Sequence, residues 1–238
     1  MILAVMQPYF FPYLGYWQLV RAVDTFIILD DVNYIVRGWV NRNRILINGE
    51  ARYVTIPLQN ASQNRTIDEV LLDPSTAWRD RLVRSIEMAY RKAPHFTEVF
   101  PLVEGLLRHP AERLADYLSH QLRTLAGHLA PETRFACAGE ILPKGDLKGQ
   151  DRILALCGHL GATTYRNLPG GQSLYDAASF HTLGVRLEFV SMRPEPYPQL
   201  RVPAFVPALS VIDALMGLGL AGVYERMAQY DLVVGEPA

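Results

Sequence analysis

The chain opens with two short apolar segments separated by one short helical stretch. Residues 2–6 (ILAVM) form a continuous apolar run that ends at Gln7-Pro8, and residues 26–29 (FIIL) form a second one. Runs of this kind are typical of parallel strands that are buried on both faces. Residues 16–23 between them have the pattern of a short helix. A strand, a helix and a second strand within about thirty residues predict a βαβ unit with a right-handed crossover.

The rest of the chain continues this alternation around one long helical stretch. Asn48-Gly49 lies between two strand-like segments and predicts a hairpin with a type I′ turn. Apolar residues then recur at helical spacing from about residue 76 to about residue 130, which predicts a helical insertion or cap. Later patterns predict strands at 134–142, 162–165 and 185–190, and helices at 151–160, 174–183, 210–218 and on to about residue 230. We therefore expect one α/β domain over residues 1–238, with a mostly parallel sheet built from Rossmann-like βαβ units.

The composition argues against several classes of protein. The formal net charge is −1, and no broadly basic surface is visible, so we expect no nucleic acid among the partners. Cys137 and Cys157 stand in apolar surroundings without a CxxC pair, which argues against a disulfide framework and a structural zinc. No apolar run is long enough to span a membrane. We expect a cytoplasmic protein that acts on a small-molecule substrate; the residues identify no cofactor and predict no metal site.

Polar residues follow the second apolar segment directly. Asp30 and Asp31 come at its carboxyl end, and open α/β sheets bind ligands at that edge. Neighbouring residues of a strand point to opposite faces, so these two carboxylates are not expected to form a dyad. A run of amides and arginines comes next, namely Asn33, Arg37, Asn41, Arg42, Asn43 and Arg44. The arginines can bind the phosphates of a nucleotide sugar, or Arg42 can hold one aspartate in a salt-bridged strand end. We favour a binding site.

Tyr13-Leu14-Gly15-Tyr16 stands between the first strand and its helix. In position it resembles the H-x-G-H loop with which the nucleotidyltransferase and class I aminoacyl-tRNA synthetase superfamily (HUP) holds ATP. In that superfamily the histidines stabilise the charge that develops on the phosphates. Tyrosine offers no imidazolium, so adenylyl transfer is in doubt here even if the fold agrees. The alternative is that these aromatic residues pack the loop over the sheet edge.

Three further segments can complete a site at this edge. Lys144-Gly145-Asp146, with Lys148 and Arg152, precedes a helix and can form a phosphate cradle or a solvated loop. Tyr165 and Tyr175 flank a Gly-Gly turn after a strand, and Tyr197 and Gln199 lie in a proline-rich loop. Ser210 and Asp213 have the spacing of a helix capping box. The six histidines and two cysteines show no catalytic arrangement, and both cysteines are interpreted as core residues.

The sequence as a whole resembles the WbqC-like protein family. The resemblance rests on MQPYFFPYLGYWQLV, FIILDDVNYIVRGWVNRNRI, TIPL at 55–58, YRKAP at 90–94, the 144–152 region, Gly161-Ala162 with Tyr165, and the segment from PYPQ at 196–199 to Asp213. It covers nearly the whole chain. The resemblance implies a place in bacterial O-antigen or surface-polysaccharide biosynthesis, and a glycine (amino-acid) transferase role has been suggested for the family.

The leading hypothesis is an enzyme that attaches an acyl or aminoacyl group to an amino sugar or sugar nucleotide. Asp30 or Asp31 would orient or deprotonate the amine, Arg37, Arg42 and Arg44 would hold a diphosphate or acyl donor, and Tyr9, Tyr13 and Tyr34 would shape the sugar site. The other residues expected to bind substrate are Gln7, Tyr16, Asn33, Asn41, Asn43, Lys144, Tyr165, Tyr175 and Gln199. Two alternatives remain: a non-catalytic subunit that escorts a sugar nucleotide between enzymes of the same pathway, and an ATP-dependent adenylate-forming enzyme.

Overall fold

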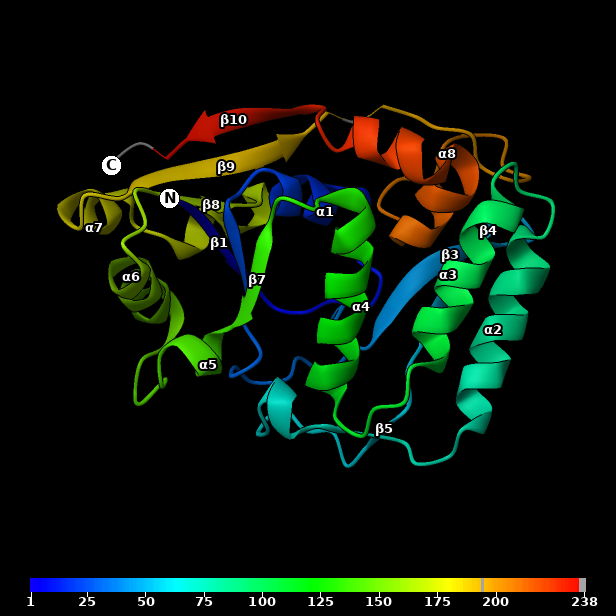
Figure 1. The fold of residues 1–238 in the computed structure, drawn as a ribbon, viewed down its shortest axis with the longest axis horizontal. Coiled ribbons are helices and arrows are strands. Elements are labelled where there is room, and N and C mark those ends of the chain that lie inside the picture. The colour runs from blue at the N-terminus through cyan, green and yellow to red at the C-terminus, as the bar shows by residue number, and fades with distance from the viewer. Residues whose placement is uncertain (194, 236–238) are drawn as a thin grey trace.

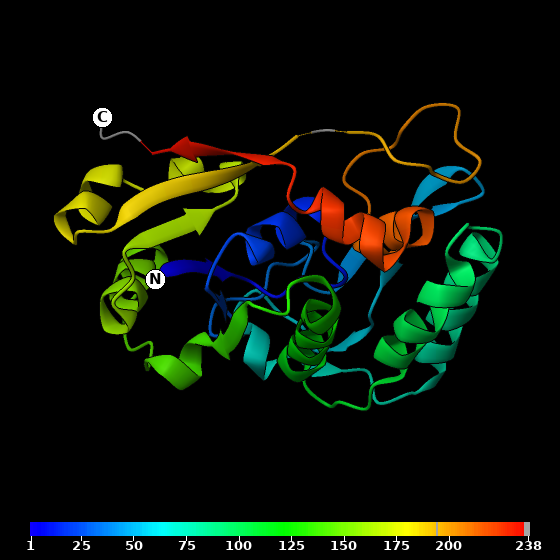
Figure 2. The ribbon, with the colours of Figure 1, turned by 45° about the horizontal axis from the view of Figure 1, so that its top comes forward.

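The computed structural model describes residues 1–193 and 195–235, and over these residues the chain builds one six-stranded sheet (Figures 1 and 2). The strand order is β10-β9-β8-β1-β2-β7. All neighbours run parallel except β10, which runs antiparallel to β9. The strands are β1 (Ile2–Met6), β2 (Thr25–Ile28), β7 (Arg134–Cys137), β8 (Thr164–Asn167), β9 (Arg186–Met192) and β10 (Tyr230–Val234). The predicted mostly parallel, Rossmann-like α/β fold is confirmed.

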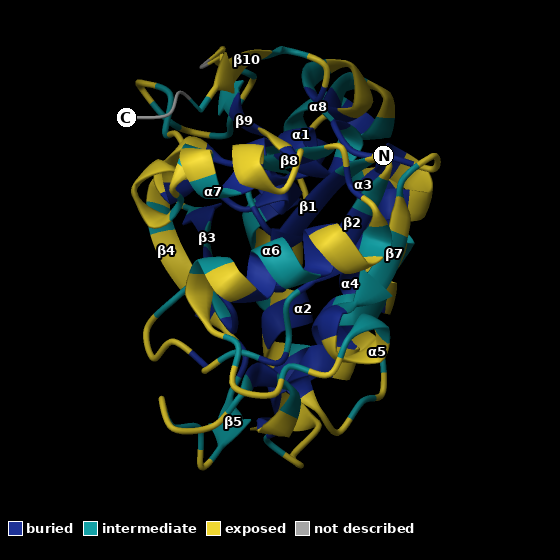
Figure 3. Ribbon diagram, turned by 90° about the vertical axis from the view of Figure 1, so that its left-hand side faces the viewer, coloured by how far each residue is buried: buried dark blue, intermediate teal, exposed yellow. Residues whose placement is uncertain are grey.

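Helices cover both faces of this sheet because alternate residues of β1 and β2 point to opposite sides. Ala4, Phe26 and Ile28 pack into the larger core, with α1 (Leu14–Arg21), α4 (Leu114–Leu129) and α8 (Val211–Arg226). Leu3, Val5 and Ile27 pack into a second core, with α6 (Gly149–Leu160) and α7 (Ala177–Thr182). Figure 3 looks at α6 from outside and shows β1 and β2 buried behind it. Burial on both faces is the reason for the continuous apolar runs.

The segment between β2 and β7 first forms short strands and then helices. The hairpin of β3 (Arg42–Ile47) and β4 (Glu50–Thr55) turns at Asn48 and Gly49, whose φ angles of 54° and 82° are those of the predicted type I′ turn. A small ladder of β5 (Leu58–Gln59) and β6 (Leu71–Leu72) encloses a 3₁₀ turn, η1 (Ile67–Glu69). The helical stretch contains α2 (Ala77–Tyr90), α3 (Phe96–Arg108) and α4.

Three predicted elements differ from the structure. The strand predicted at 134–142 ends at Cys137, because Cys137 and Glu140 form a capping box that starts α5 (Ala138–Ile141). The helix predicted at 174–183 begins only at Ala177 as α7, since the Asp176 carboxylate caps the amides of Ala178 and Ser179; a 3₁₀ helix, η2 (Pro169–Leu174), precedes it. The final helix ends at Arg226 rather than near Tyr230, and the β-prone segment after it forms β10 against β9.

Within residues 1–193 and 195–235, none of the helices combines the length and the apolar character that a membrane crossing requires. The same residues contain no group of three or more histidine, cysteine, aspartate or glutamate side chains placed to hold a metal ion.

Candidate functional site

The strand order defines where a ligand can bind at the edge of the sheet. From β1 the chain proceeds to β2 and β7 on one side, and later to β8 and β9 on the other side. Ligands of open parallel sheets bind outside the carboxyl ends of the strands near such a reversal. Gln7 follows β1, Asp30 and Asp31 follow β2, and Asn167 ends β8. The polar residues that follow these strands therefore meet at one edge.

A cleft of about 540 Å³ opens at this edge on the side of α6. Three segments form its walls: Val32 and Asn33 after β2, Lys148 and Gln150 at the start of α6, and Tyr175 after η2. The remaining lining residues are Leu29, Lys144, Leu147, Gly149, Arg152, Ile153 and Leu174. We call this the sheet-edge cleft. It brings the residues after Asp31 together with the loop that follows β8, as a single site requires.

Arg152 lines the sheet-edge cleft and forms a buried ion pair with Asp31, which is not itself a lining residue. Arg152 Nη2 lies 2.6 Å from Asp31 Oδ2, and the arginine is only 1% exposed. The guanidinium also donates to the carbonyls of Ala138 and Leu142, and Lys144 Nζ donates to the Asp31 carbonyl at 2.7 Å. The alternative to a binding site was that Arg42 holds Asp30 or Asp31 in a salt bridge; the structure pairs Asp31 with Arg152 instead.

The pair leaves polar atoms unused. Within the described residues, Asp31 Oδ1 and Arg152 Nε and Nη1 are buried without a hydrogen-bond partner. Buried polar groups in native proteins normally have partners, and those that lack one call for an explanation. We interpret these unpaired atoms of Asp31 and Arg152 as hydrogen-bonding groups available to a polar ligand group or to ordered water.

Asp30 lies on the other side of the β2 terminus, next to β7. Ile28 is paired with Cys137 in the sheet, which brings the Cys137 side chain close to the Asp30 carboxylate. Burial raises the pKa of Asp30 to about 6, and the nearby charges of Asp68 and Asp31 add to this shift. The two aspartate side chains thus lie in different surroundings, which agrees with the expectation that they do not form a dyad.

The raised pKa of Asp30 predicts a pH-dependent stability. An acid whose folded pKa exceeds its unfolded pKa stabilises the fold below the unfolded value, near 3.8, and this contribution is lost as the pH rises to about 6. Asp30→Asn should therefore match the wild type at pH 4 and be more stable than it at pH 7.5, as measured by urea unfolding. Asp146→Asn, on an exposed loop, is the control and should show no such gain. Equal effects of Asp30→Asn at both pH values would contradict the burial of this carboxyl group.

Comparison with known proteins identifies the family of this chain. The model of the WbqC-like protein family matches residues 7–225. The chain belongs to the WbqC-like protein family. It is also similar to the "Uncharacterized protein Rv1507c" of Mycobacterium tuberculosis (strain ATCC 25618 / H37Rv), at 30% identity over 220 residues that cover 91% of this chain and 93% of the relative. No solved structure gives a significant match.

Two of the amides of this WbqC-like protein that were expected to bind substrate, Asn41 and Asn43, support the backbone and do not line the cleft. Asn43 is 4% exposed, and its Nδ2 donates to the carbonyls of Phe10 and Phe11 at 3.0 and 2.8 Å. Asn41 Oδ1 accepts from the Tyr34 hydroxyl at 2.8 Å, and its Nδ2 donates to the Ile56 carbonyl. These contacts fix the loop after β1 against the hairpin.

The arginines of the same run lie on the hairpin side. Arg42 stacks over the Tyr53 ring at 4.5 Å and donates to the Arg37 carbonyl. Arg44 donates to the carbonyl of Ala208, and Arg37 is exposed. None of them lines the sheet-edge cleft, whereas Asn33 does.

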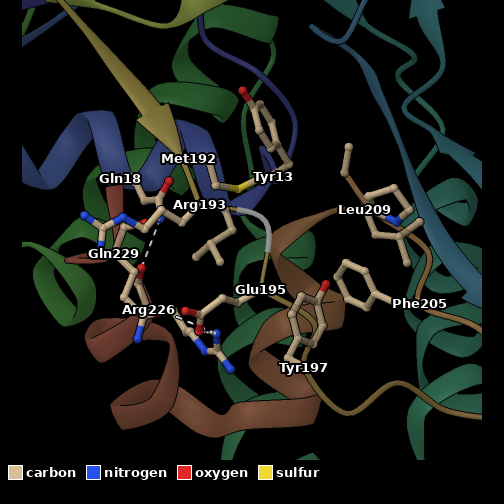
Figure 4. A pocket seen from close by; sticks show the side chains of 13 residues that line it. Tyr13, Gln18, Met192, Arg193, Glu195, Tyr197, Phe205, Leu209, Arg226 and Gln229 are labelled. Carbon is tan, nitrogen blue, oxygen red and sulfur yellow. Dashed lines mark hydrogen bonds and ion pairs between the residues drawn. The ribbon is translucent and has the colours of Figure 1, made fainter. Parts of the chain in front are cut away.

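The tyrosines of the loop after β1 pack on the face that carries α1. The Tyr16 hydroxyl donates to the Gln7 carbonyl at 3.0 Å, and the Tyr9 ring lies 5.7 Å from the Tyr16 ring. A Cβ at Gly15 would lie 2.5 Å from the Tyr13 ring, so this glycine makes room for a tyrosine. Tyr13 lines a separate pocket at the end of β9, together with Gln18, Met192 and Tyr197 (Figure 4).

Three further predicted residues, Tyr165, Tyr175 and Gln199, belong to hydrogen-bond networks. Tyr165 and Tyr175 have hydroxyls 3.1 Å apart, and Asn167 Nδ2 donates to both. Gln199 donates to Asp213 Oδ2 at 2.8 Å, and the Tyr90 hydroxyl donates to Asp213 Oδ1 at 2.8 Å. The expected capping box is therefore wrong in its second half: Ser210 caps the Ile212 amide, but the Asp213 carboxylate is turned toward Tyr90 and Gln199.

Arg152 and Asn167 are the site residues that the sequence least reveals. Arg152 precedes the apolar stripe Ile153, Leu156 and Cys157 on α6, and a charged residue next to such a stripe is a signal for a buried ion pair. Asn167 is the last residue of β8, where the sheet-edge rule applies.

Proposed function

We propose that this WbqC-like protein is an enzyme of bacterial surface-polysaccharide biosynthesis that transfers an acyl or aminoacyl group, such as glycine, to an amino sugar or sugar nucleotide. The observation that supports this best is the sheet-edge cleft, which combines a cationic wall with the Asp31 carboxylate, the ion-pair partner of the lining residue Arg152. A donor or acceptor of this kind carries phosphate at one end and an amine at the reacting end. The two parts of the cleft match these two groups.

The cationic wall suits the phosphates. Lys148 is the N-cap residue of α6, a helix of 12 residues, and its side chain does not cap the helix. The N-terminus of a helix carries partial positive charge and favours bound anions. Lys144 lies beside it, with its Nζ held 2.7 Å from the Asp31 carbonyl. A diphosphate bound here would place the attached sugar toward Asp31 and Tyr175.

The carboxylate suits the amine. Asp31 Oδ2 lies 2.6 Å from the Arg152 guanidinium, and Oδ1 has no hydrogen-bond partner among the described residues. The unused Asp31 Oδ1 can accept a hydrogen bond from the amine and take its proton as the nitrogen attacks the acyl carbonyl. A carbon–nitrogen bond forms, the bond to the donor's leaving group breaks, and the proton passes to Asp31. Asp30 remains the second candidate for this role.

One observation supports the non-catalytic alternative. The residues that line the sheet-edge cleft include no histidine, cysteine or serine, so none of these three side-chain types can carry a covalent acyl-enzyme intermediate there. A subunit that only escorts a sugar nucleotide would need the cationic wall and not the carboxylate.

A thermal-shift screen with sugar nucleotides, amino-sugar nucleotides and acyl-coenzyme A compounds tests the proposal. A ligand at ~100 times its dissociation constant should add ~2.7 kcal/mol to the stability. Lys148→Gln should remove most of this shift, whereas Lys92→Gln, an exposed lysine on another element, should retain it. A panel without any stabilising ligand, or an equal shift in both variants, would contradict the proposed binding site.

Product formation then separates enzyme from escort. With the stabilising sugar nucleotide and an acyl donor, Asp31→Asn should still bind the ligand but lose product, as followed by mass spectrometry. Binding without product in the wild type, across all donors that bind, would favour the escort role.

A further inference from the structure

Two arginines of the described chain are almost fully buried, and only one of them has a carboxylate partner. Arg152, 1% exposed, is paired with Asp31. Arg79, 9% exposed, lies in the first turn of α2 and forms no salt bridge with any described residue. Since a guanidinium stays charged in proteins, its burial without a counter-charge is unfavourable. The position of Arg79 therefore calls for a negative charge that the described chain does not supply.

The hydrogen bonding of Arg79 is also incomplete. Among the described residues its guanidinium makes one hydrogen bond, from Nη2 to the Ala111 carbonyl at 3.3 Å, and its Nε is buried without a partner. A guanidinium has five N–H donors in a fixed plane. The group lies 4.3 Å above the Trp78 ring and 5.9 Å from the Tyr117 ring, which hold that plane in place. The result is a rigid donor with unused capacity.

Arg79 lines a cavity of about 580 Å³, which we call the Arg79 cavity. Thr76, the N-cap residue of α2, borders it, as does Arg108 at the end of α3. The Arg108 guanidinium is already bound to Asp80 and Glu104 at 2.7 and 2.8 Å. Two carboxylates also border the cavity, Asp73 and Glu112, and neither lies within salt-bridge distance of Arg79. The charge of Arg79 is thus left for a ligand.

We propose that the Arg79 cavity is an anion-binding site for a small oxyanion group, a phosphate or a carboxylate, which the Arg79 guanidinium binds. Planar bidentate binding of oxyanions is the characteristic chemistry of arginine, and the N-terminus of the 14-residue helix α2 adds favourable partial charge. In Figures 1 and 2, α2 lies at the opposite end of the molecule from α6. This site is therefore distinct from the sheet-edge cleft and does not depend on the proposed function.

The pKa of His109, a histidine near Arg79, reports directly on anion binding to Arg79. Burial lowers the pKa of His109, and the neighbouring His120 and Arg79 charges lower it further. His109 and His120 are stacked with ring centroids 3.5 Å apart. An anion bound to Arg79 offsets the guanidinium charge, so it should raise the pKa of His109, which NMR titration of the histidine ring protons can follow.

The experiment titrates the full-length protein with inorganic phosphate and, separately, with acetate, at an ionic strength kept constant with sodium chloride. We expect saturable binding of at least one of them, a higher thermal midpoint, and a rise in the pKa of His109. Arg79→Met should weaken the affinity at least tenfold. Arg91→Met, at the exposed far end of the same helix, should leave it unchanged. If Arg79→Met does not fold, Arg79→Lys keeps the charge but loses the planar fork and should weaken binding severalfold.

The two anions separate the possible sources of the group. A response to phosphate alone identifies a phosphorylated ligand, and a response to acetate alone identifies a carboxylate; each supports the site. Absence of saturable binding of both anions, or equal affinity in wild type and Arg79→Met, would overturn the proposal.

Discussion

Replacing Arg152 by methionine is expected to lower the free energy of unfolding by about 3–5 kcal/mol, because it leaves the Asp31 carboxylate buried without its partner. The pair is well shielded: the side chains of Arg152 and Asp31 are 1% and 12% exposed. Methionine retains most of the side-chain length, so the change removes charge and hydrogen bonds more than it removes volume. Urea unfolding at pH 7 measures the effect.

The double variant Asp31→Asn with Arg152→Met identifies the cause. It removes both charges, so it should recover most of the stability that Arg152→Met loses. Arg52→Met is the matched control, since the Arg52–Glu50 pair is exposed and such pairs contribute little. If the double variant is as unstable as Arg152→Met, the lost stability comes from the hydrogen bonds to the Ala138 and Leu142 carbonyls, and the ion pair contributes little to the free energy of unfolding.

Replacing Asn43 by alanine is expected to cost about 1–3 kcal/mol, since the buried carbonyl of Phe10 loses its donor. The carbonyl of Phe11 also loses the Asn43 amide but keeps the Ser210 hydroxyl as a donor. Asn43→Asp should destabilise similarly, because a carboxylate cannot donate to a carbonyl. Thermal and urea unfolding measure both variants.

This prediction distinguishes a supporting role from a binding role. Asn33→Ala, an exposed amide of the same sequence run, should change the stability by less than about 0.5 kcal/mol. Normal stability of Asn43→Ala, together with weaker binding of a sugar nucleotide, would show that Asn43 contacts the substrate directly.

The sequence predicts the central part of the fold well because the signals there are local. The apolar runs at β1 and β2 and the polar residues after them lie within thirty-one residues of the N-terminus, and each element carries its own pattern. β10 is harder, since a five-residue strand that is mostly exposed takes its conformation from β9 rather than from its own pattern. Local pattern gives no register for such a strand.

The candidate site is also predicted only where its residues follow from a local pattern. The position of Asp31 at the sheet edge follows from the strand before it. Its partner, Arg152, lies 121 residues further along the chain, whereas a local pattern can only suggest an arginine that is close in sequence, such as Arg42. The amide of Asn43 is visible in the sequence, whereas the carbonyls it binds belong to a loop more than thirty residues away. Side-chain chemistry can be read locally; the contacts that decide between support and binding cannot.

The central place of β1 in the sheet has a consequence for folding during translation. β1 pairs with β2 on one edge and with β8 on the other, and β8 follows β2 by about 140 residues. At a translation rate of about 5–20 residues per second, the second edge of β1 waits roughly 7–28 s for its partner. An unpaired apolar edge is prone to pair with other chains. The nascent protein therefore needs shielding during this interval, and slower translation lengthens its exposure to aggregation.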